Sequence, residues 1–423
     1  MKQSSLDLFY EINMQKNRKL VVAHLQLLPL MSGVQKVSLD EMALISRDTF
    51  DPVLICKMPG DFTDAVAALG IPCHFVKEME RSIKPWADLK AVYQLYKVFR
   101  KIRPDVVHTH SSKTGVLGRI AAKLAGVPAV IHTVHGFPFD SAANVVQRSF
   151  YVGLEWISAR FCDAMVLLKE ADLEFSRRTL SVPREKLHLI PNGVAMNDFE
   201  PMPVQLKHVR KTELLDSSSK EICIAMTGRL WEQKNPECFV EAAIEVLKTG
   251  VTNARFFLIG DGPLRGILQD MIDRSGYVEH ITILGWRSDV PVLLQVTDVF
   301  VLPSRWEGLS LAILEAMASG LPVVASDIPG NTDLVQDGVT GYQFKGEVAA
   351  SLAEKLLLLI NDSGKRVAMG IAGRMSVNAH YRIENRVKTM EQLYLKLLPA
   401  AAHPRLADNN FQEEIVARQT STH

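Results

Sequence analysis

The sequence predicts an α/β protein of two doubly wound domains, each a parallel sheet between layers of helices, facing each other across a cleft. At 423 residues, the chain is long enough for two or three domains with full cores. Short apolar runs alternate with longer helical patterns, which is the rhythm of βαβ units. Most of these runs are apolar almost throughout, as parallel strands are when helices cover both faces.

The strands are expected in two series, one for each domain. The first series comprises residues 19–28, 53–57, 73–76, 105–110, 129–135, 164–168 and 187–191. The second comprises residues 221–227, 255–259, 281–284, 299–303, 322–326 and 342–344. Ligands of such sheets bind outside the carboxyl ends of the strands, so two facing domains would share one site there.

The domain boundaries follow from breaks in this rhythm, the main one after Pro191-Asn192-Gly193, where a polar stretch begins. The predicted divisions are an N-terminal extension (1–18), a first Rossmann-like domain (19–195), a linker region (196–220), a second domain (221–379), a terminal helix (380–398) and a flexible tail (399–423).

Composition and charge limit the possible partners. The chain is 47% hydrophobic and 22% charged with a net charge of +1, which excludes a disordered protein, a coiled coil and a nucleic-acid-binding protein that is basic overall. Residues 1–195 carry 25 basic and 19 acidic side chains, and the remainder carries 23 and 28. The sum near zero therefore conceals a basic first half and an acidic second half.

Two expected helices of the first domain mix aromatic with basic residues. Residues 86–103 place Trp86 and Tyr93 among lysines and arginines, and residues 145–161 combine Phe150 and Trp156 with two arginines. The first helix has either a solvated basic face or a surface for an anionic lipid or a diphosphate-bearing acceptor. The second either lies at a membrane surface or packs in the core.

The expected location is the cytoplasm. No apolar run reaches the roughly 18 residues of a membrane helix, and the first 17 residues lack the pattern of a secretory signal. The five cysteines are scattered and form no C-x-x-C pair, which favours reduced thiols over disulfides or zinc ligands.

The strongest motif spans residues 304–322. Ser310 is expected to cap a helix that begins at Leu311, and Gly320 to end it. Gly308 lets the backbone approach a ligand, and the N–H groups near Leu309 and Ser310 suit a phosphate.

Two carboxylates, Glu307 and Glu315, flank this expected anion site. Hydroxyls on both sides of a phosphate would match them, and a nucleotide sugar has that arrangement. Arg229 and Lys234 follow the first strand of the second domain, where two cations would neutralise a diphosphate. Gly33, after the first strand of the chain, would admit a phosphate, but it belongs to no complete dinucleotide-binding motif.

Histidines cluster at two strand ends of the first domain. His108 and His110 end one strand, and His132 and His135 end the next. A metal site is disfavoured because no cysteine or carboxylate cluster has matching spacing. We expect His135 to bind a substrate oxygen, and His108 and His132 to be structural, with one facing the core where the other faces the cleft.

Together these residues resemble the nucleotide-sugar glycosyltransferases of family 4, which have the GT-B fold. The resemblance covers residues 19–398. It is most specific in the pair Glu307 and Glu315 with seven residues between, and in residues 190–194, 228–236 and 258–263. Residues 132–137 resemble the branch that builds bacterial surface polysaccharides, O-antigens and exopolysaccharides.

The resemblance implies roles for these residues. Arg229 and Lys234 would hold the donor diphosphate, Glu307 the sugar hydroxyls, and His135 would contact the sugar near the anomeric centre. The terminal helix would cross back to the first domain. The remaining donor-binding residues would be Gly33, Gly308, Leu309, Ser310, Glu315 (toward the ribose), Trp286 and Arg287 (toward the base). Ser32-Gly33 stands where the family often has two glycines, which weakens the phosphate contact expected there.

The implied function is retaining transfer of a hexose or N-acetylhexosamine from a nucleotide-diphosphate sugar, expected to be UDP-linked. The acceptor would be a polyprenyl-diphosphate-linked saccharide, at an anionic membrane surface on the inner face of the bacterial inner membrane. The chain contains no D-x-D sequence, so no metal or other cofactor is expected, and cations and a helix start would stabilise the leaving group.

Other functions stay open at this stage. The chain could be a GT-B nucleotide-sugar epimerase or a phosphorylase that binds pyridoxal phosphate. It could also be a non-catalytic partner in a polysaccharide assembly complex, although such a subunit need not keep Arg229, Lys234, Glu307 and Glu315.

Overall fold

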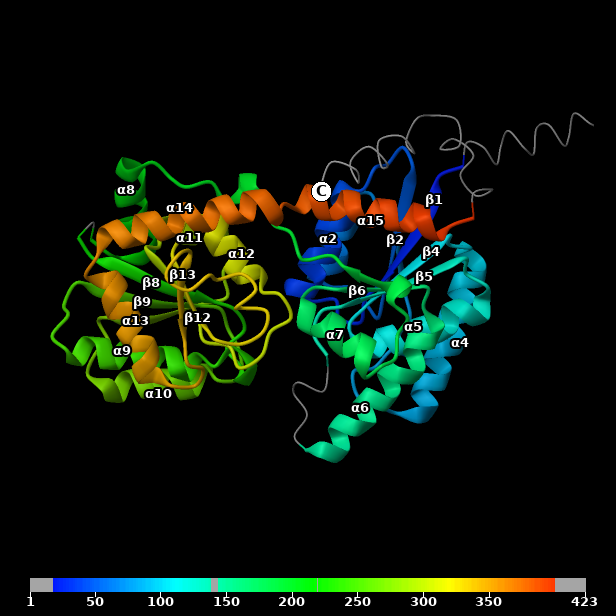
Figure 1. The fold of residues 1–423 in the computed structure, drawn as a ribbon, viewed down its shortest axis with the longest axis horizontal. Helices are drawn as coiled ribbons and strands as arrows, with labels where there is room; N and C mark the ends of the chain where they lie inside the picture. Colours follow the sequence, from blue (N-terminus) through cyan, green and yellow to red (C-terminus); the bar gives the residue numbers. More distant parts are fainter. Residues whose placement is uncertain (1–17, 138–143, 219, 400–423) are drawn as a thin grey trace, which may run out of the picture.

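Two parallel α/β domains form the molecule, as predicted (Figure 1). The computed structural model describes residues 18–137, 144–218 and 220–399. Apart from Arg18 and Pro399, the expected N-terminal extension and tail lie outside the described residues.

The first sheet has seven parallel strands in the order β3-β2-β1-β4-β5-β6-β7. Its strands are β1 (Leu20–Leu25), β2 (Phe50–Cys56), β3 (Cys73–Phe75), β4 (Val106–His110), β5 (Ala129–Val134), β6 (Ala164–Leu167) and β7 (Leu187–Leu189). Every strand end lies within three residues of its expected position, because a parallel strand covered on both faces stands out as an apolar run.

The second sheet has six parallel strands in the order β10-β9-β8-β11-β12-β13. Its strands are β8 (Ile222–Thr227), β9 (Ala254–Ile259), β10 (Ile281–Gly285), β11 (Val299–Leu302), β12 (Val323–Ser326) and β13 (Gly341–Phe344). In each sheet the strand order reverses beside the first strand of the domain, β1 or β8, which is where such sheets bind ligands.

Helices cover both faces of each sheet. The first domain has α2 (Gly33–Leu44), α3 (Asp61–Ala68), α4 (Pro85–Ile102), α5 (Ser112–Ala125), α6 (Val145–Ser158), α7 (Glu170–Arg178) and the 3-10 turns η2 (Ala159–Phe161) and η3 (Arg184–Lys186). The rest of the chain has η4 (Met196–Phe199), α8 (Val204–Leu215), η5 (Glu232–Lys234), α9 (Pro236–Lys248), α10 (Arg265–Ser275), α11 (Val290–Val296), α12 (Leu311–Ala318), α13 (Ala349–Ile360), α14 (Ser363–His380) and α15 (Ile383–Leu397).

The segment 196–220, which we expected to link the domains, is folded where it is described. It contains η4 and α8, and Leu215 at the end of α8 packs against α11 and the second sheet. Met196 and Phe199 of η4 pack against α12 in the same domain. Most of this segment therefore covers the second domain.

The terminal helix α15 returns to the first domain, beyond α14 on the second (Figure 1). Its Met390, Leu393 and Tyr394 are buried against strands β1, β4 and β5. Arg386 on the same helix is 3% exposed. Its guanidinium donates to Glu41 of α2 and to the carbonyl oxygens of Ile190 and Pro191.

Candidate active site

The loop between β11 and α12 forms the centre of the site. Ser310 caps α12 by accepting a hydrogen bond from the Ile313 amide, and the helix begins at Leu311, both as predicted. Gly320 follows the helix in a left-handed conformation, as expected for its end. The helix has eight residues, and its N-terminus points its first amides toward the loop residues Gly308 and Leu309.

Lys234 and Glu307 connect this loop to the second-domain loop that follows β8. Lys234 Nζ lies 2.5 Å from Glu307 Oε1, and the Ser304 hydroxyl donates to the same oxygen at 2.7 Å. Glu307 is 8% exposed, so its carboxylate is held with little access to water. Because β8 and β11 are neighbouring strands, the two residues meet although 72 others separate them in the sequence.

Arg229 is exposed on the same loop as Lys234 and differs from Lys234 in its partners. Its guanidinium lies 5.1 Å from the centre of the Trp231 ring and forms no ion pair among the described residues. The loop that carries Arg229 packs closely against Gly260, directly after strand β9. A Cβ on Gly260 would lie 1.9 Å from the Gly228 carbonyl oxygen, so residue 260 must be glycine for this loop to stay where it is.

The first domain contacts the donor-side loop directly. A Cβ on Gly308 would lie 2.2 Å from the His135 carbonyl oxygen, so the two backbones touch. Lys169 Nζ donates to the Glu307 carbonyl oxygen at 2.5 Å, and Asn192 Nδ2 donates to the Leu309 carbonyl oxygen at 2.8 Å. These contacts hold the loop by its carbonyl groups, and no described residue accepts a hydrogen bond from the amides of Gly308, Leu309 or Ser310.

Glu315 lies one turn into α12 and faces α2 of the first domain. Burial raises the pKa of its carboxyl group to about 7, while the nearby charge of Lys36 favours the ionised form and that of Asp40 opposes it. Lys36 and Asp40 are themselves paired at 2.7 Å. Gly33, at the start of α2, faces Leu311 across the same gap, since a Cβ there would lie 3.7 Å from that side chain.

Trp286 and Arg287 follow β10, two strands away from β8. Trp286 is 67% exposed, and the Arg287 guanidinium makes two hydrogen bonds to Asp289 at 2.8 and 2.6 Å. The loop is joined to the site through the Gly260 amide, which donates to the Gly285 carbonyl oxygen. The structure thus leaves Trp286 open to a ligand and gives Arg287 an acidic partner.

The histidines at the strand ends occupy both faces of the first sheet. His108 and His110 share one face with His24 of β1, because side chains two residues apart on a strand point the same way. His132 lies on the other face, under α5, where it bonds the Thr109 hydroxyl. His108 and His132 are both buried, so neither faces the cleft, contrary to the expectation for one of them.

The shared face contains a compact polar cluster of four residues, the histidine cluster. Ligand-type atoms of His24, Glu41, His108 and His110 all lie within 4.8 Å of one another. His108 bonds the Tyr394 hydroxyl at 2.8 Å and the Thr133 hydroxyl at 2.7 Å. The sequence offered no carboxylate near these histidines, and the fold supplies one from α2.

Burial keeps the histidine rings neutral. It lowers the pKa of His24 and of His135 to about 3, and it holds the pKa values of His108 and His110 well below their usual range. It also raises the pKa of Glu41, against the opposing effect of the adjacent Arg386 guanidinium.

Family comparisons agree with the geometry. Residues 32–193 match the family described as glycosyl transferase 4-like domain, and residues 221–362 match glycosyl transferases group 1. The chain is 38% identical to the UDP-Gal:alpha-D-GlcNAc-diphosphoundecaprenol alpha-1,3-galactosyltransferase of Escherichia coli, over 90% of this chain and 98% of that protein. The chain belongs to the group 1 glycosyltransferases.

Other relatives and solved structures place this glycosyltransferase among GT-B proteins, as predicted. It is 29% identical to the N,N'-diacetylbacillosaminyl-diphospho-undecaprenol alpha-1,3-N-acetylgalactosaminyltransferase of Campylobacter jejuni, over 83% of this chain and 92% of that protein. The crystal structure of Anabaena HepE with UDP and glucose superposes with a TM-score of 0.77, at 18% identity, over 89% of this chain and all of that one. Sucrose-phosphate synthase of Thermosynechococcus elongatus gives 0.75 at 18% identity, over 90% and 99% of the two chains.

Sequence reasoning missed several residues of the glycosyltransferase site. Lys169 follows a strand as Arg229 does, and that position was its one available signal. His24 stood out only as a polar residue in an apolar strand. Glu41 and Arg386 lie on helices and had no distinguishing pattern, because their importance comes from meeting each other across 345 residues of sequence.

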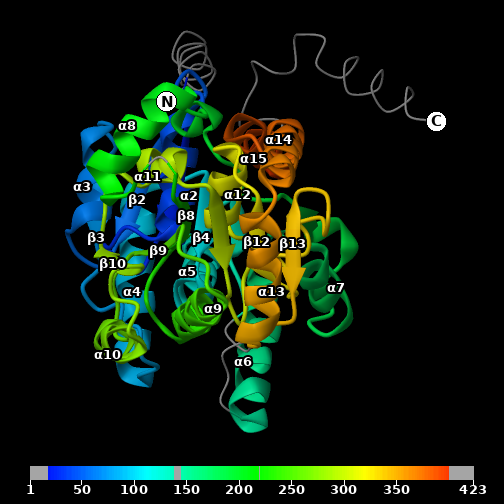
Figure 2. The same ribbon diagram turned by 90° about the vertical axis from the view of Figure 1, so that its left-hand side faces the viewer.

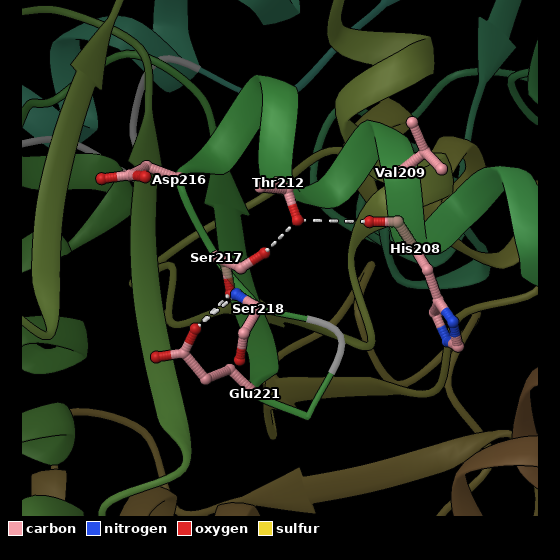
Figure 3. A pocket seen from close by; sticks show the side chains of 7 residues that line it. All are labelled: His208, Val209, Thr212, Asp216, Ser217, Ser218 and Glu221. Carbon is pink, nitrogen blue, oxygen red and sulfur yellow. Dashed lines mark hydrogen bonds between the residues drawn. The ribbon is translucent and has the colours of Figure 1, made fainter.

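A surface pocket lies elsewhere on the second domain, where α8 ends (Figure 3). Its lining residues are His208, Val209, Thr212, Asp216, Ser217, Ser218 and Glu221. The Ser218 amide donates to Glu221 at 2.6 Å, and the Thr212 hydroxyl to the Ser217 carbonyl at 3.1 Å. None of the residues singled out from the sequence lines it.

Within the described ranges, the helices are too short or too polar to cross a bilayer.

Proposed function

We propose that this glycosyltransferase moves a hexose, with retention and without a metal ion, from a UDP-sugar to a saccharide linked to polyprenyl diphosphate. The observation that carries the proposal is the ion pair of Lys234 with Glu307 in the loop before α12, with Arg229 exposed on the same loop as Lys234. The activity of the similar Escherichia coli enzyme supports UDP-galactose as donor and an N-acetylglucosaminyl-diphospholipid as acceptor. Structures of HepE with UDP support the same nucleotide.

Each cation has a distinct part in this proposal. Arg229, without an acidic partner among the described residues, supplies charge to the leaving diphosphate. Lys234 is shared between the diphosphate and Glu307, and so orients the carboxylate toward the hydroxyls of the donor sugar. The amides of Leu309 and Ser310 add donors at the helix start.

The reaction needs no enzymic nucleophile in this arrangement. The acceptor hydroxyl attacks the anomeric carbon on the face from which UDP departs. A C–O bond forms as the bond to the diphosphate breaks, and an oxygen of the departing diphosphate takes the hydroxyl proton. Glu307 positions the sugar and does not act as the base, because its carboxylate is already engaged by Lys234 and Ser304.

A membrane-facing surface on α4 and α6 of the first domain fits a lipid-linked acceptor. Helix α6 projects from the domain in both views (Figures 1 and 2). Its large exposed apolar residues are Val145, Val146, Phe150, Trp156 and Ile157, and those of α4 are Trp86, Leu89 and Tyr93. Basic side chains flank them: Lys97 lies 4.9 Å from the Tyr93 ring centre, and Arg160 lies 3.5 Å from that of Trp156.

The test is transfer to a synthetic N-acetylglucosaminyl diphospholipid. UDP-galactose, UDP-glucose, UDP-N-acetylglucosamine and UDP-N-acetylgalactosamine are offered in turn, with and without EDTA. We expect one UDP-hexose to give an α-linked product whose formation EDTA does not change. A β-linked product would refute retention, and loss of activity in EDTA that added metal restores would refute metal independence. Conversion of the donor without acceptor would identify an epimerase.

A further inference from the structure

A row of three histidines, the last of which is His135, crosses the first sheet. His24 lies on β1, His110 ends β4, and His135 follows β5, and these strands are direct neighbours. His24 Nδ1 lies 3.1 Å from His110 Nε2, and His110 Nδ1 lies 3.1 Å from His135 Nε2. The three rings thus form one hydrogen-bonded chain that begins in the core and ends where the domains touch.

The two hydrogen bonds of this chain must run in the same direction from donor to acceptor. A neutral imidazole has one N–H donor and one acceptor nitrogen. Two hydrogen bonds in series therefore allow only two arrangements. Either His24 donates to His110 and His110 donates to His135, or both bonds run in reverse.

The two ends of the chain distinguish these arrangements. His24 Nε2 is buried, and no described residue bonds to it. His135 is less buried than His24 and His110, and no described residue bonds to its Nδ1. In the reverse arrangement His24 Nε2 would be a buried N–H without an acceptor, and orphaned buried donors are the rarer and costlier case. The forward arrangement places the last proton on His135 Nδ1.

Hydrogen bonding accounts for the arrangement of the histidine cluster better than a bound metal ion does. Glu41, the carboxylate of the histidine cluster, already pairs with Arg386 at 2.8 Å, and that buried cation would repel a divalent ion. His108 uses both ring nitrogens on Tyr394 and Thr133. His24 and His110 bond each other. Most of the ligand-type atoms of the cluster are thus already engaged, and His24 Nε2 and Glu41 Oε2 are the two that no described residue bonds.

We propose that His24 and His110 are positioning residues that hold His135 as the tautomer protonated at Nδ1, so that its N–H is presented to an oxygen of the bound donor. The proposal rests on the proposed function in one respect, the contact between His135 and the donor. The location supports it: the backbone of His135 touches Gly308 of the donor-side loop.

The direct test is the tautomer of His135 in the full-length enzyme without ligands. Protein labelled with ¹⁵N-histidine is examined by long-range ¹H–¹⁵N NMR, with His135→Gln used to assign the signals. We expect a single neutral tautomer with the proton on Nδ1. In His110→Phe, which keeps a ring but removes both nitrogens, we expect a mixture of the two tautomers. His24→Phe should weaken the preference in the same direction.

Kinetics supply the second readout. His110→Phe should lower kcat/KM for transfer about tenfold, the effect of one misdirected hydrogen bond. His110→Asn keeps an amide near the position of Nδ1 and should recover most of this loss. His132→Phe is the matched control, because His132 is equally buried in the same sheet but lies outside the chain. It should leave the tautomer of His135 unchanged.

Three results would overturn the proposal. They are a His135 protonated at Nε2 in the unmodified enzyme, a tautomer that His110→Phe leaves unchanged, and one equivalent of tightly bound metal in the purified protein. Should His110→Phe fail to fold, the unmodified enzyme and His24→Phe still decide. If no acceptor is glycosylated, the proposed function fails, but the NMR result stands by itself.

Discussion

Lys234 Nζ lies 2.5 Å from Glu307 Oε1 and ties together the loops after two neighbouring strands of the second domain. The pair is largely buried, with 17% and 8% of the two side chains exposed. A buried carboxylate that loses its cation is left with an uncompensated charge, whereas a buried amide is not. The two residues should therefore respond differently to substitution.

Lys234→Met should abolish transfer and also destabilise the second domain by about 2 kcal/mol, because the Glu307 carboxylate would keep only the Ser304 hydroxyl as a partner among the described residues. Glu307→Gln should abolish transfer with a smaller loss of stability, because the Lys234 ammonium that it leaves without an anion is the more exposed member of the pair. Arg229→Ala, at an exposed position, should abolish transfer with little change in stability. Steady-state transfer assays and thermal unfolding of the three variants check this. Near-normal turnover in purified Arg229→Ala or Glu307→Gln would show that the site is assigned wrongly.

Gly308→Ala should reduce transfer at least a hundredfold while leaving the stability of each domain intact. The new Cβ would lie 2.2 Å from the His135 carbonyl oxygen, so the domains could not approach to their present distance. Small-angle scattering should detect a more open molecule. Gly266→Ala on α10 is the control, since nothing lies within 4 Å of its Cβ. Equal activity of the two variants would contradict the contact.

The raised pKa of the Glu315 carboxyl group predicts that the affinity for the donor depends on pH. With its pKa raised to about 7, the carboxyl group is mostly protonated below that pH and ionised above it. A ribose hydroxyl donates better to a carboxylate than to a carboxylic acid. The affinity for a UDP-sugar should therefore rise as the pH increases from 6 to 8.

Glu315→Gln should bind the UDP-sugar more weakly and remove this pH dependence. Titration calorimetry at several pH values compares the two proteins. Lys36→Met provides a second check, because loss of that nearby cation should move the transition to higher pH. A pH dependence that survives in Glu315→Gln would assign it to another group.

The histidines with lowered pKa values predict loss of stability in acid. His24, His108, His110 and His135 have pKa values far below the usual 6.5 in the folded protein, so the unfolded chain binds more protons below that pH. Stability should fall as the pH drops below about 6.5 and continue to fall toward pH 3. Thermal unfolding from pH 7.5 to 5 measures this. His24→Phe should show a shallower decline, and an unchanged slope would contradict the desolvated state of His24.

The exposed apolar residues of α6 predict binding to membranes. Phe150 and Ile157 are each 50% exposed, and the basic side chain of Arg160, just after the helix, lies over the Trp156 ring. The double substitution of Phe150 and Ile157 by Ser should weaken sedimentation with vesicles containing anionic phospholipid at least fivefold. Ile371→Ser on α14 alters a similarly exposed residue of the second domain and should have no effect. Equal binding by the α6 variant would assign the apolar face another role.

The sequence predicted those features of the structure that depend on residues close together in the chain. Every strand was predicted to within three residues, since apolar runs and turn residues follow from the backbone geometry of buried parallel strands. The cap at Ser310 and the placement of Arg229, Lys234 and Glu307 at strand ends also followed from local pattern. Residues at the carboxyl ends of neighbouring parallel strands must lie near one another, so much of the candidate site was predictable.

Only the tertiary structure decided which distant groups pair. It showed that Lys234 is shared with Glu307, that Lys169 and Asn192 hold the donor-side loop, and that the segment 196–220 is largely folded onto the second domain. It also brought Glu41 from α2 to the buried histidines and Arg386 from α15 to Glu41. Such contacts leave no periodic trace, because each depends on how whole helices and sheets pack against one another. The sequence thus determined the strands and the positions of the reactive groups, and the packing determined their partners and protonation.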